Sequence, residues 1–250
     1  MIVKNRLLNF GNKVIYQDND SFLFSLDSVL LPNFVTVKLS DKKIIDLCCG
    51  NAPGPMLLSF KTKARIFGVE IQKEIYELGI KSIKENGMDE QITLINDDVK
   101  NLYNVFESES FDIVTCNPPY FKYKVDSLVN INDKKTIARH EMYIKLEEII
   151  EISRYLLRNS GTFAMVHRPD RLIEIIEVMR KNNIEPKKIR YVYPKIEKEA
   201  NMILIEGVKN GKSGLKILPP LITHDKDGNY CQEIKNMFCY SLDSNSDIDR

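Results

Sequence analysis

The amino-acid sequence predicts an α/β fold: a doubly wound, mostly parallel sheet with a terminal antiparallel hairpin and a small N-terminal appendage. From residue 43 onward, short apolar runs rich in Ile and Val alternate with longer amphipathic segments, as in parallel sheets covered on both faces. Near the end, two apolar runs are joined by a link too short for a crossover helix, which favours an antiparallel pair. Residues 1–40 precede this alternation, and Gly11-Asn12 within them is typical of a hairpin turn.

Each element is expected from its apolar spacing. The runs that predict parallel strands are KIIDLC (43–48), RIFGVE (65–70), ITLIN (92–96), FDIVTCN (111–117) and GTFAMVH (161–167). Helical spacing is found after Gly54 in PMLLSF and over 72–86, 141–158 and 169–183. The terminal pair is predicted at 188–194 and 201–209.

Length and composition limit the organisation of the chain. With 250 residues and 43% hydrophobic positions, one large domain over 41–240 is expected, preceded by the appendage 1–40. Residues 241–250 have few core-forming side chains and are expected to be a flexible tail. The five cysteines form no CxxC pair and there are three histidines, so no metal site is predicted. The N-terminus lacks the apolar run of a signal peptide, and no apolar stretch could span a membrane, which predicts a soluble cytoplasmic protein.

The loop after the first strand predicts a ligand site. In open α/β sheets, ligands bind at the carboxyl ends of the strands. The first strand ends with Asp46, and Gly50 and Gly54 follow within a loop whose backbone must turn sharply. The next strand ends at Glu70, where a carboxylate can accept hydrogen bonds from both hydroxyls of a ribose.

The pattern of carboxylates favours S-adenosylmethionine over a nicotinamide dinucleotide. The loop lacks G-x-G-x-x-G, and Asp46 would direct a negative charge at a pyrophosphate. S-adenosylmethionine instead carries a sulfonium and an ammonium, which suit carboxylates. The third strand ends in Asn96-Asp97-Asp98, where a side chain can reach an adenine amino group.

The fourth strand ends in a motif with chemical meaning, Asn117-Pro118-Pro119-Tyr120. Two prolines hold the backbone extended and have no N–H, so the Pro118 carbonyl remains an acceptor beside the Asn117 amide oxygen. Two converging acceptors suit an aromatic or amide NH₂ group. Tyr120 can stack on a planar base.

At these residues the sequence resembles the amino-methyltransferases, which modify adenine N6, cytosine N4, guanine N2 or protein glutamine. Further segments resemble the bacterial tRNA1(Val) adenine-37 N6-methyltransferases, over about residues 1–240: FSLDSVLL (24–31), ARHE (138–141), VHRPDRL (166–172), YVYPKIEKEAN (191–201) and NGKSGLKILPPL (210–221). The resemblance implies a Rossmann-like class I methyltransferase fold with a seven-stranded sheet, S-adenosylmethionine as cofactor, and an anticodon-loop adenine of tRNA as substrate. No obligatory protein partner is implied.

The resemblance also assigns residues to the cofactor. It places Asp46, Gly50 and Asn51 at the methionine end and Glu70 on the ribose. It places Asp98 at the adenine of the cofactor, and the adjacent Asp97 is the alternative for the same contact. Ser25 and Asp27 fall in the appendage segment that closes over the methionine moiety. The resemblance assigns Asn117, Pro118 and Tyr120 to the target base. Asn117 is assigned to the cofactor site as well.

Two departures and two alternatives accompany this interpretation. Cys48 and Ala52 stand where the family loop commonly has glycine, which puts tight donor binding slightly in doubt. The same motif could methylate a protein glutamine, or the fold could be retained only to bind RNA.

A charge asymmetry favours RNA. Residues 154–216 contain 14 basic and 7 acidic side chains, although the whole chain has a net charge of +1. Arg168, Arg171, Lys195 and Lys198 are the candidate phosphate contacts, and Arg154 and Arg180 are expected on outer helix faces. If the excess is ordinary solvated surface, the RNA face is expected in 1–40 or in the loop 121–139.

Overall fold

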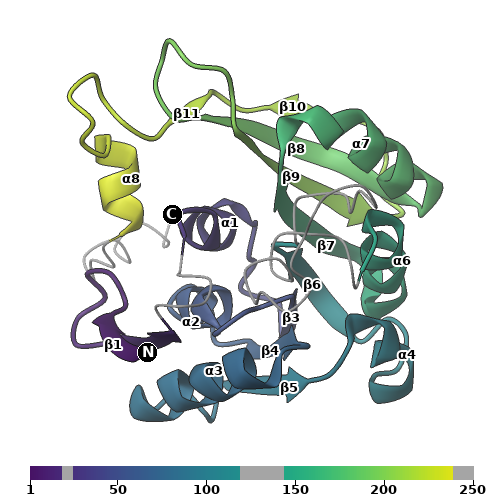
Figure 1. The fold of residues 1–250 in the computed structure, drawn as a ribbon. Helices are drawn as coiled ribbons and strands as arrows, with labels where there is room; N and C mark the ends of the chain where they lie inside the picture. Colours follow the sequence, from purple (N-terminus) through teal and green to yellow (C-terminus); the bar gives the residue numbers. More distant parts are fainter. Residues whose placement is uncertain (19–24, 119–143, 239–250) are drawn as a thin grey trace, which may run out of the picture.

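The computed structural model describes residues 1–18, 25–118 and 144–238, and the fold is given for these ranges. A central twisted sheet carries helices on both faces, and a small two-stranded sheet stands beside it (Figure 1). The predicted α/β architecture is confirmed.

The parallel part of the sheet contains five strands in the order β5-β4-β3-β6-β7. Their bounds are β3 Lys43–Leu47, β4 Arg65–Glu70, β5 Ile92–Asn96, β6 Phe111–Cys116 and β7 Leu157–His167. Strand order reverses between β3 and β6, the topological switch point at which α/β proteins bind ligands. The five parallel strands predicted from apolar runs are all present.

The terminal antiparallel pair is also confirmed. β8 (Ile184–Tyr193) and β9 (Met202–Lys209) are antiparallel, and β9 lies between β7 and β8. Two further strands of two residues each, β10 (Lys216–Ile217) and β11 (Leu221–Ile222), pair with β8 and bring the sheet to nine strands instead of seven. Dipeptide strands leave no periodicity for a sequence to reveal.

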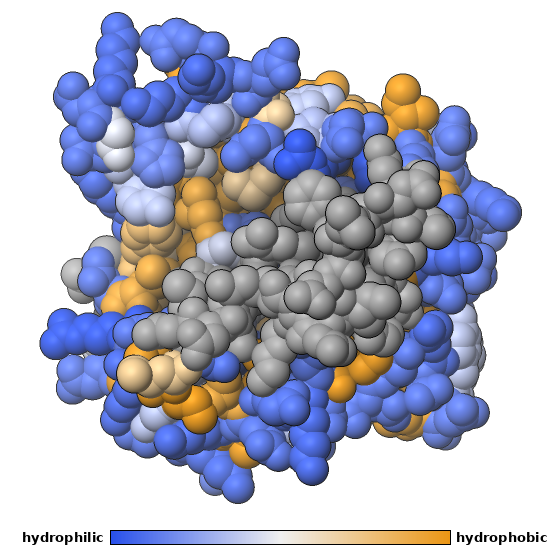
Figure 2. Space-filling view, viewed as in Figure 1, coloured by the Kyte–Doolittle hydropathy of each residue, from blue (hydrophilic) through white to orange (hydrophobic). Residues whose placement is uncertain are grey.

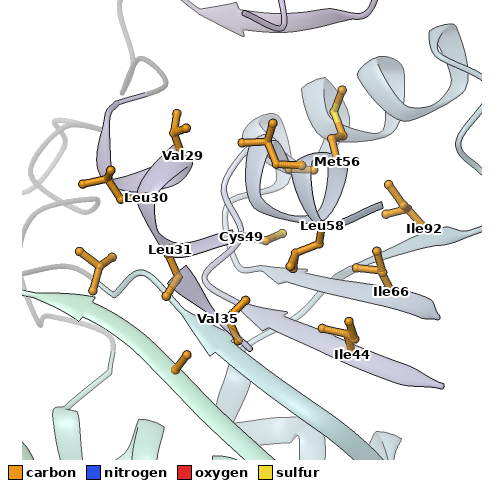
Figure 3. Close-up of a cluster of buried hydrophobic side chains, with 14 of the residues drawn as sticks. Val29, Leu30, Leu31, Val35, Ile44, Cys49, Met56, Leu58, Ile66 and Ile92 are labelled. Atoms are coloured by element: carbon orange, nitrogen blue, oxygen red, sulfur yellow. The ribbon is translucent and has the colours of Figure 1, made fainter. Parts of the chain in front are cut away.

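The helices divide between the two faces of the sheet because strand residues alternate. Ile44 faces the core formed with α1, α2 and α3, whereas Ile45 faces the core formed with α4, α6 and α7. Figure 3 shows the first core, in which α1 and α2 side chains meet those of the strands. The bounds are α1 Asp27–Phe34, α2 Pro53–Ser59, α3 Lys73–Glu85, α4 Leu102–Val105, α6 Leu146–Leu156 and α7 Leu172–Lys181, with single turns η1 Val99–Asn101 and η2 Pro169–Arg171.

Boundaries differ from the predictions at several elements: α7 is shorter than the predicted helix 169–183, and β7 and β8 begin earlier than predicted. α6 ends at Leu156 rather than at 158, because β7 begins at Leu157, which pairs with Phe111 of β6. The first residues of the predicted helix, 141–143, lie outside the described ranges. Within the described ranges, no helix is long and apolar enough to cross a membrane.

The N-terminal hairpin forms as predicted and packs on α3. β1 (Ile2–Arg6) and β2 (Val14–Asp18) are antiparallel. Asn86 of α3's end accepts a hydrogen bond from Val14 N at 2.9 Å and donates one to Val14 O at 2.7 Å. At the other terminus, α8 (Gln232–Met237) is followed by Phe238, whose carbonyl accepts from Asn9 N at 3.0 Å. The two ends of the described chain therefore meet at this hairpin.

Candidate active site

The polar side chains predicted from the strand ends lie at one edge of the sheet. Asp46 of β3 is in register with Gly68 of β4 and Thr115 of β6. Glu70 ends β4 and is in register with Asn96, the last residue of β5. The edge therefore gathers two carboxylates and one amide from three neighbouring strands beside the switch point.

Asp46 is buried, with 6% of its surface exposed. Thr115 Oγ1 donates to Asp46 Oδ1 at 2.6 Å, and burial raises the pKa of the carboxyl to about 7. A Cβ on Gly54 would lie 2.6 Å from Asp46 Oδ2, so only glycine lets the start of α2 come this close. The start of α2 therefore lies directly against the carboxylate of Asp46.

The loop between β3 and α2 turns through left-handed backbone conformations. Gly50 has φ +58°, and a Cβ there would meet nothing within 4 Å. Cys48 (φ +57°) and Ala52 (φ +71°) adopt the same region without being glycine. Such a conformation costs an L-residue roughly 1–2 kcal/mol, a cost that glycine would avoid at these two places.

Glu70 binds this loop with its carboxylate. Gly50 N donates to Oε2 at 3.0 Å and Gln72 N donates to Oε1 at 2.9 Å. Burial raises the pKa of Glu70, and the backbone donors oppose that shift. The Ile71 backbone and the Gln72 side chain also donate toward this carboxylate, so a ligand hydroxyl there would share its two oxygens with these donors.

Asp97 and Asp98, the two candidate adenine contacts after β5, have different hydrogen-bond partners. Asp97 Oδ1 accepts from Asp98 N and Asn101 Nδ2, each at 2.7 Å. Asp98 caps the turn η1 by accepting from Lys100 N at 2.9 Å, and its other oxygen lies 3.3 Å from Lys100 Nζ. Both carboxylates are anchored at the edge, and both stay candidates.

Ser25 and Asp27 stand at the start of α1, a helix that the sequence analysis does not predict. Ser25 Oγ donates to Asp27 Oδ1, which also accepts from Ser28 N at 3.0 Å. Asp27 is buried. Their assignment to the cofactor stays a prediction.

Asn51 has a role that the sequence did not indicate. Its Nδ2 donates to Tyr16 O of β2 at 2.8 Å, and its side chain is buried. The amide thus fastens the β3–α2 loop to the N-terminal hairpin. A contact between residues 35 positions apart leaves no local pattern in the sequence.

Asn117 and Pro118 follow β6 directly. Cys116, the last residue of β6, is in register with Leu47, so Asn117 lies beside the loop that begins at Cys48. Asn117 is half-buried and Pro118 is buried. Tyr120 lies outside the described residues.

The next strand, β7, ends in His167, whose ring has a structural role. His167 is fully buried, and its Nδ1 accepts from Arg168 N at 2.8 Å. Burial lowers the pKa of this histidine to about 4, so the ring is neutral near pH 7. The described residues contain no cluster of three or more side chains suited to a metal ion.

One candidate phosphate contact is wrong. Arg171 is 7% exposed and forms an ion pair with Glu174, with Nη2···Oε1 at 2.6 Å and Nε···Oε2 at 3.0 Å. A buried, bidentate pair of this kind is a structural element rather than an RNA contact. Arg168, Lys195 and Lys198 follow strands that end at the same edge as β6.

Comparison with known proteins agrees with this architecture. Two curated relatives are each called tRNA1(Val) (adenine(37)-N6)-methyltransferase. The one from Cytophaga hutchinsonii is 23% identical over 159 residues, 64% of this chain and 65% of that protein. The one from Parabacteroides distasonis is 23% identical over 202 residues, 81% of this chain and 83% of that protein.

Solved structures share the fold. A predicted O-methyltransferase from Agrobacterium tumefaciens superposes with a TM-score of 0.68 at 19% identity, covering 86% of this chain and 98% of that one. Geranyl diphosphate C-methyltransferase from Streptomyces coelicolor, solved with S-adenosyl-L-homocysteine, gives 0.56 at 11% identity over 73% of this chain and 76% of that one. A family model described as a methyltransferase domain matches residues 38–216. From this match, which spans more than half of its length, the chain belongs to the methyltransferase domain family.

Proposed function

We propose that the protein transfers a methyl group from S-adenosylmethionine to N6 of an adenine in tRNA, at position 37 of tRNA1(Val). The observation that carries the proposal is the register of β3 and β6. It sets Asn117 beside the loop that follows the buried carboxylate Asp46. Relatives bearing the name of this activity match up to 81% of the chain, which supports the same substrate.

The residues present fit a cationic, ribose-bearing donor. Asp46 is buried and has an elevated pKa, and a positive sulfonium or ammonium group would stabilise its ionised form. Gly50 leaves open space above the loop, and Glu70 offers acceptors for ribose hydroxyls. Ser25 and Asp27 extend the acidic lining from α1. We infer that the appendage 1–40 closes this end of the site, fastened to the loop through Asn51 and Tyr16.

The catalytic task of the protein is alignment and polarisation. The donor supplies an already activated methyl group, so the chain has to hold N6 in line with it. The exocyclic amine is a poor nucleophile because its lone pair delocalises into the ring. The Asn117 amide oxygen and the Pro118 carbonyl counter this by accepting the two N–H groups. Tyr120 stacks on the base, and an adenine in a single-stranded loop is cheaper to present than one in a duplex.

The experiment is methyl transfer to unmodified tRNA by purified protein, followed by nucleoside mass spectrometry. N6-methyladenosine is expected in tRNA incubated with the wild type. Asn117→Ala should abolish transfer and leave donor affinity nearly intact, because its acceptor acts on the amine in the transition state. Asn159→Ala is the matched control, since Asn159 lies at the exposed start of β7. A methylated protein glutamine with unmodified tRNA would refute the proposal in favour of the alternative substrate.

A further inference from the structure

The loop between β11 and α8 carries a pair of stacked aromatic rings. His224 and Tyr230 have ring centroids 4.5 Å apart, with 32° between their planes. An isolated β-bridge joins the backbones of the same two residues. Phe238 supports Tyr230 edge-on, at 4.9 Å and 89°. Tyr230 nevertheless stays 37% exposed.

The aromatic pair belongs to the same edge of the sheet as the candidate active site. β11 runs parallel to β8, and β8 runs in the direction of β7 and β6, so all four end at one edge. His224 N donates to Pro194 O at 3.1 Å, which fixes the loop to the end of β8. Four inter-strand spacings separate β6 from β11, roughly 19 Å at about 4.8 Å per spacing. That span corresponds to a few nucleotides of a single strand.

Lys195 and Lys226 lie on the two loops that meet at the pair, and two nearby carboxylates, Asp225 and Glu233, bind other groups of the protein. Lys195 Nζ donates to Lys226 O at 3.2 Å, which brings the two loops together. Asp225 accepts from Asn229 N at 2.9 Å within its own turn, and Glu233 forms an ion pair with Arg190 at 2.6 Å. Across the described residues, no ion pair involves Lys195 or Lys226. Figure 2 shows a hydrophilic lobe at the upper left of the view, where Figure 1 places these loops, with a hydrophobic strip below it.

We propose that Tyr230, backed by His224, is a stacking site for one unpaired base of the substrate RNA, a base other than the methylated adenine. An exposed ring held rigidly by two aromatic neighbours loses little entropy when a base stacks on it. The ammonium groups of Lys195 and Lys226 lie where they can reach the flanking phosphates. The proposal rests on the proposed function, because it assumes an RNA substrate.

A double-mutant cycle tests the contact. Tyr230→Leu keeps the apolar packing against Phe238 and removes the aromatic face. It should weaken binding of an RNA anticodon stem-loop by about tenfold, since stacking on one aromatic side chain contributes roughly 1–3 kcal/mol per base. An abasic site at one loop nucleotide other than the target should weaken wild-type binding to the same extent. The two losses should not add, which identifies the stacked nucleotide.

The control is Tyr103→Leu. Tyr103 is 46% exposed and packs against Tyr155 with ring centroids 4.7 Å apart and planes tilted by 59°, but it follows η1 on α4, away from the β8 and β11 ends. Its replacement should leave RNA affinity unchanged. Because stacking does not release counterions, the Tyr230→Leu loss should persist at high salt.

Two results would overturn the stacking site. One is wild-type RNA affinity in a folded Tyr230→Leu variant, judged by unchanged melting temperature and unchanged donor affinity. The other is a loss that adds to every abasic substitution. If wild-type protein methylates tRNA and either result is found, only the stacking site falls; if the wild type forms no N6-methyladenosine, the proposed function falls first.

Discussion

Asp46 and Asn51 differ in how far the sequence alone reveals them. Asp46 ends an apolar run, and parallel strands bring their carboxyl ends to one edge, so its place was predictable. The positions of Glu70 and Asn117 at the same edge were predictable for the same reason. The contact made by Asn51 was not predictable, because it depends on packing between distant elements. The Arg171–Glu174 pair is local, with i,i+3 spacing, but the burial of Arg171 depends on the fold around it. Local pattern identifies a strand end but does not tell which partner a polar side chain meets there.

The elevated pKa of Asp46 predicts how donor affinity depends on pH. In the folded protein the carboxyl ionises near pH 7, against an ordinary value of 3.8. A cationic donor favours the ionised form, so its affinity should fall as the pH drops below 7, by at most tenfold per pH unit. Calorimetric titration between pH 5.5 and 7.5 measures this slope. Asp46→Asn should bind more weakly and lose the dependence.

The same shift has the opposite consequence for the unliganded protein. Because the folded-state pKa lies above the unfolded one, the protonated carboxyl stabilises the fold at low pH, and this contribution is lost between about pH 4 and 7. Asp46→Asn should therefore flatten that part of the melting-temperature profile. An unchanged profile in the variant would contradict the assignment of the shift to Asp46.

At the scale of elements, α1 shows why a helix without an apolar stripe could not be predicted from the sequence. Its apolar residues run consecutively from Val29 to Leu31 and are followed by Pro32, so no one-sided stripe exists. The helix forms because α2 covers one side and the sheet the other (Figure 3). The amphipathic helices α3, α6 and α7 face the core on one side only, so their helical period is visible in the sequence. The parallel strands face a core on both sides and are visible as short apolar runs.

The C-terminal end of α1 is held by a buried ion pair. Glu206 of β9 accepts from Thr36 N at 2.7 Å and lies 3.0 Å from Lys188 Nζ, which itself donates to Phe34 O at 2.8 Å. Removing one member leaves the other charge without its partner, so Glu206→Ala should lower the free energy of unfolding by about 3 kcal/mol. Adding Lys188→Met should recover part of that loss.

Chemical denaturation of the two single variants and the double variant measures this coupling. Lys187→Met is the control, because Lys187 is half-buried and its ammonium makes a solvent-exposed hydrogen bond to Lys212 O at 2.9 Å. It should change stability by less than about 0.5 kcal/mol. Simple additivity of Glu206→Ala and Lys188→Met would show that the pair is not coupled.

At the scale of the molecule, the charge asymmetry predicts a salt-dependent RNA affinity. Of the four candidate phosphate contacts, Arg168, Lys195 and Lys198 remain at the sheet edge after Arg171 is excluded. Replacing Lys195 and Lys198 together with Gln should weaken tRNA binding and reduce the slope of log K against log salt by about 1–2. Donor affinity should not change, since both lysines lie on the β8 side.

Arg154→Gln with Arg180→Gln is the matched control, because these residues belong to α6 and α7 on the outer face. Fluorescence titration of labelled tRNA at several salt concentrations gives both slopes. Equal slopes for the Lys195/Lys198 variant and the wild type would contradict this prediction. The RNA-binding surface would then be expected in 1–40 or 121–139.

The position of β9 between β7 and β8 bears on how the chain folds during synthesis. The ribosome completes β8 before β9, yet β8 reaches the rest of the sheet only through β9. Until residue 209 has left the exit tunnel, the growing chain carries an unpaired strand and an open edge on β7, each a template for pairing with a neighbouring chain. A nascent polypeptide stalled near residue 200 should accordingly depend on chaperones, whereas one released after 238 should not.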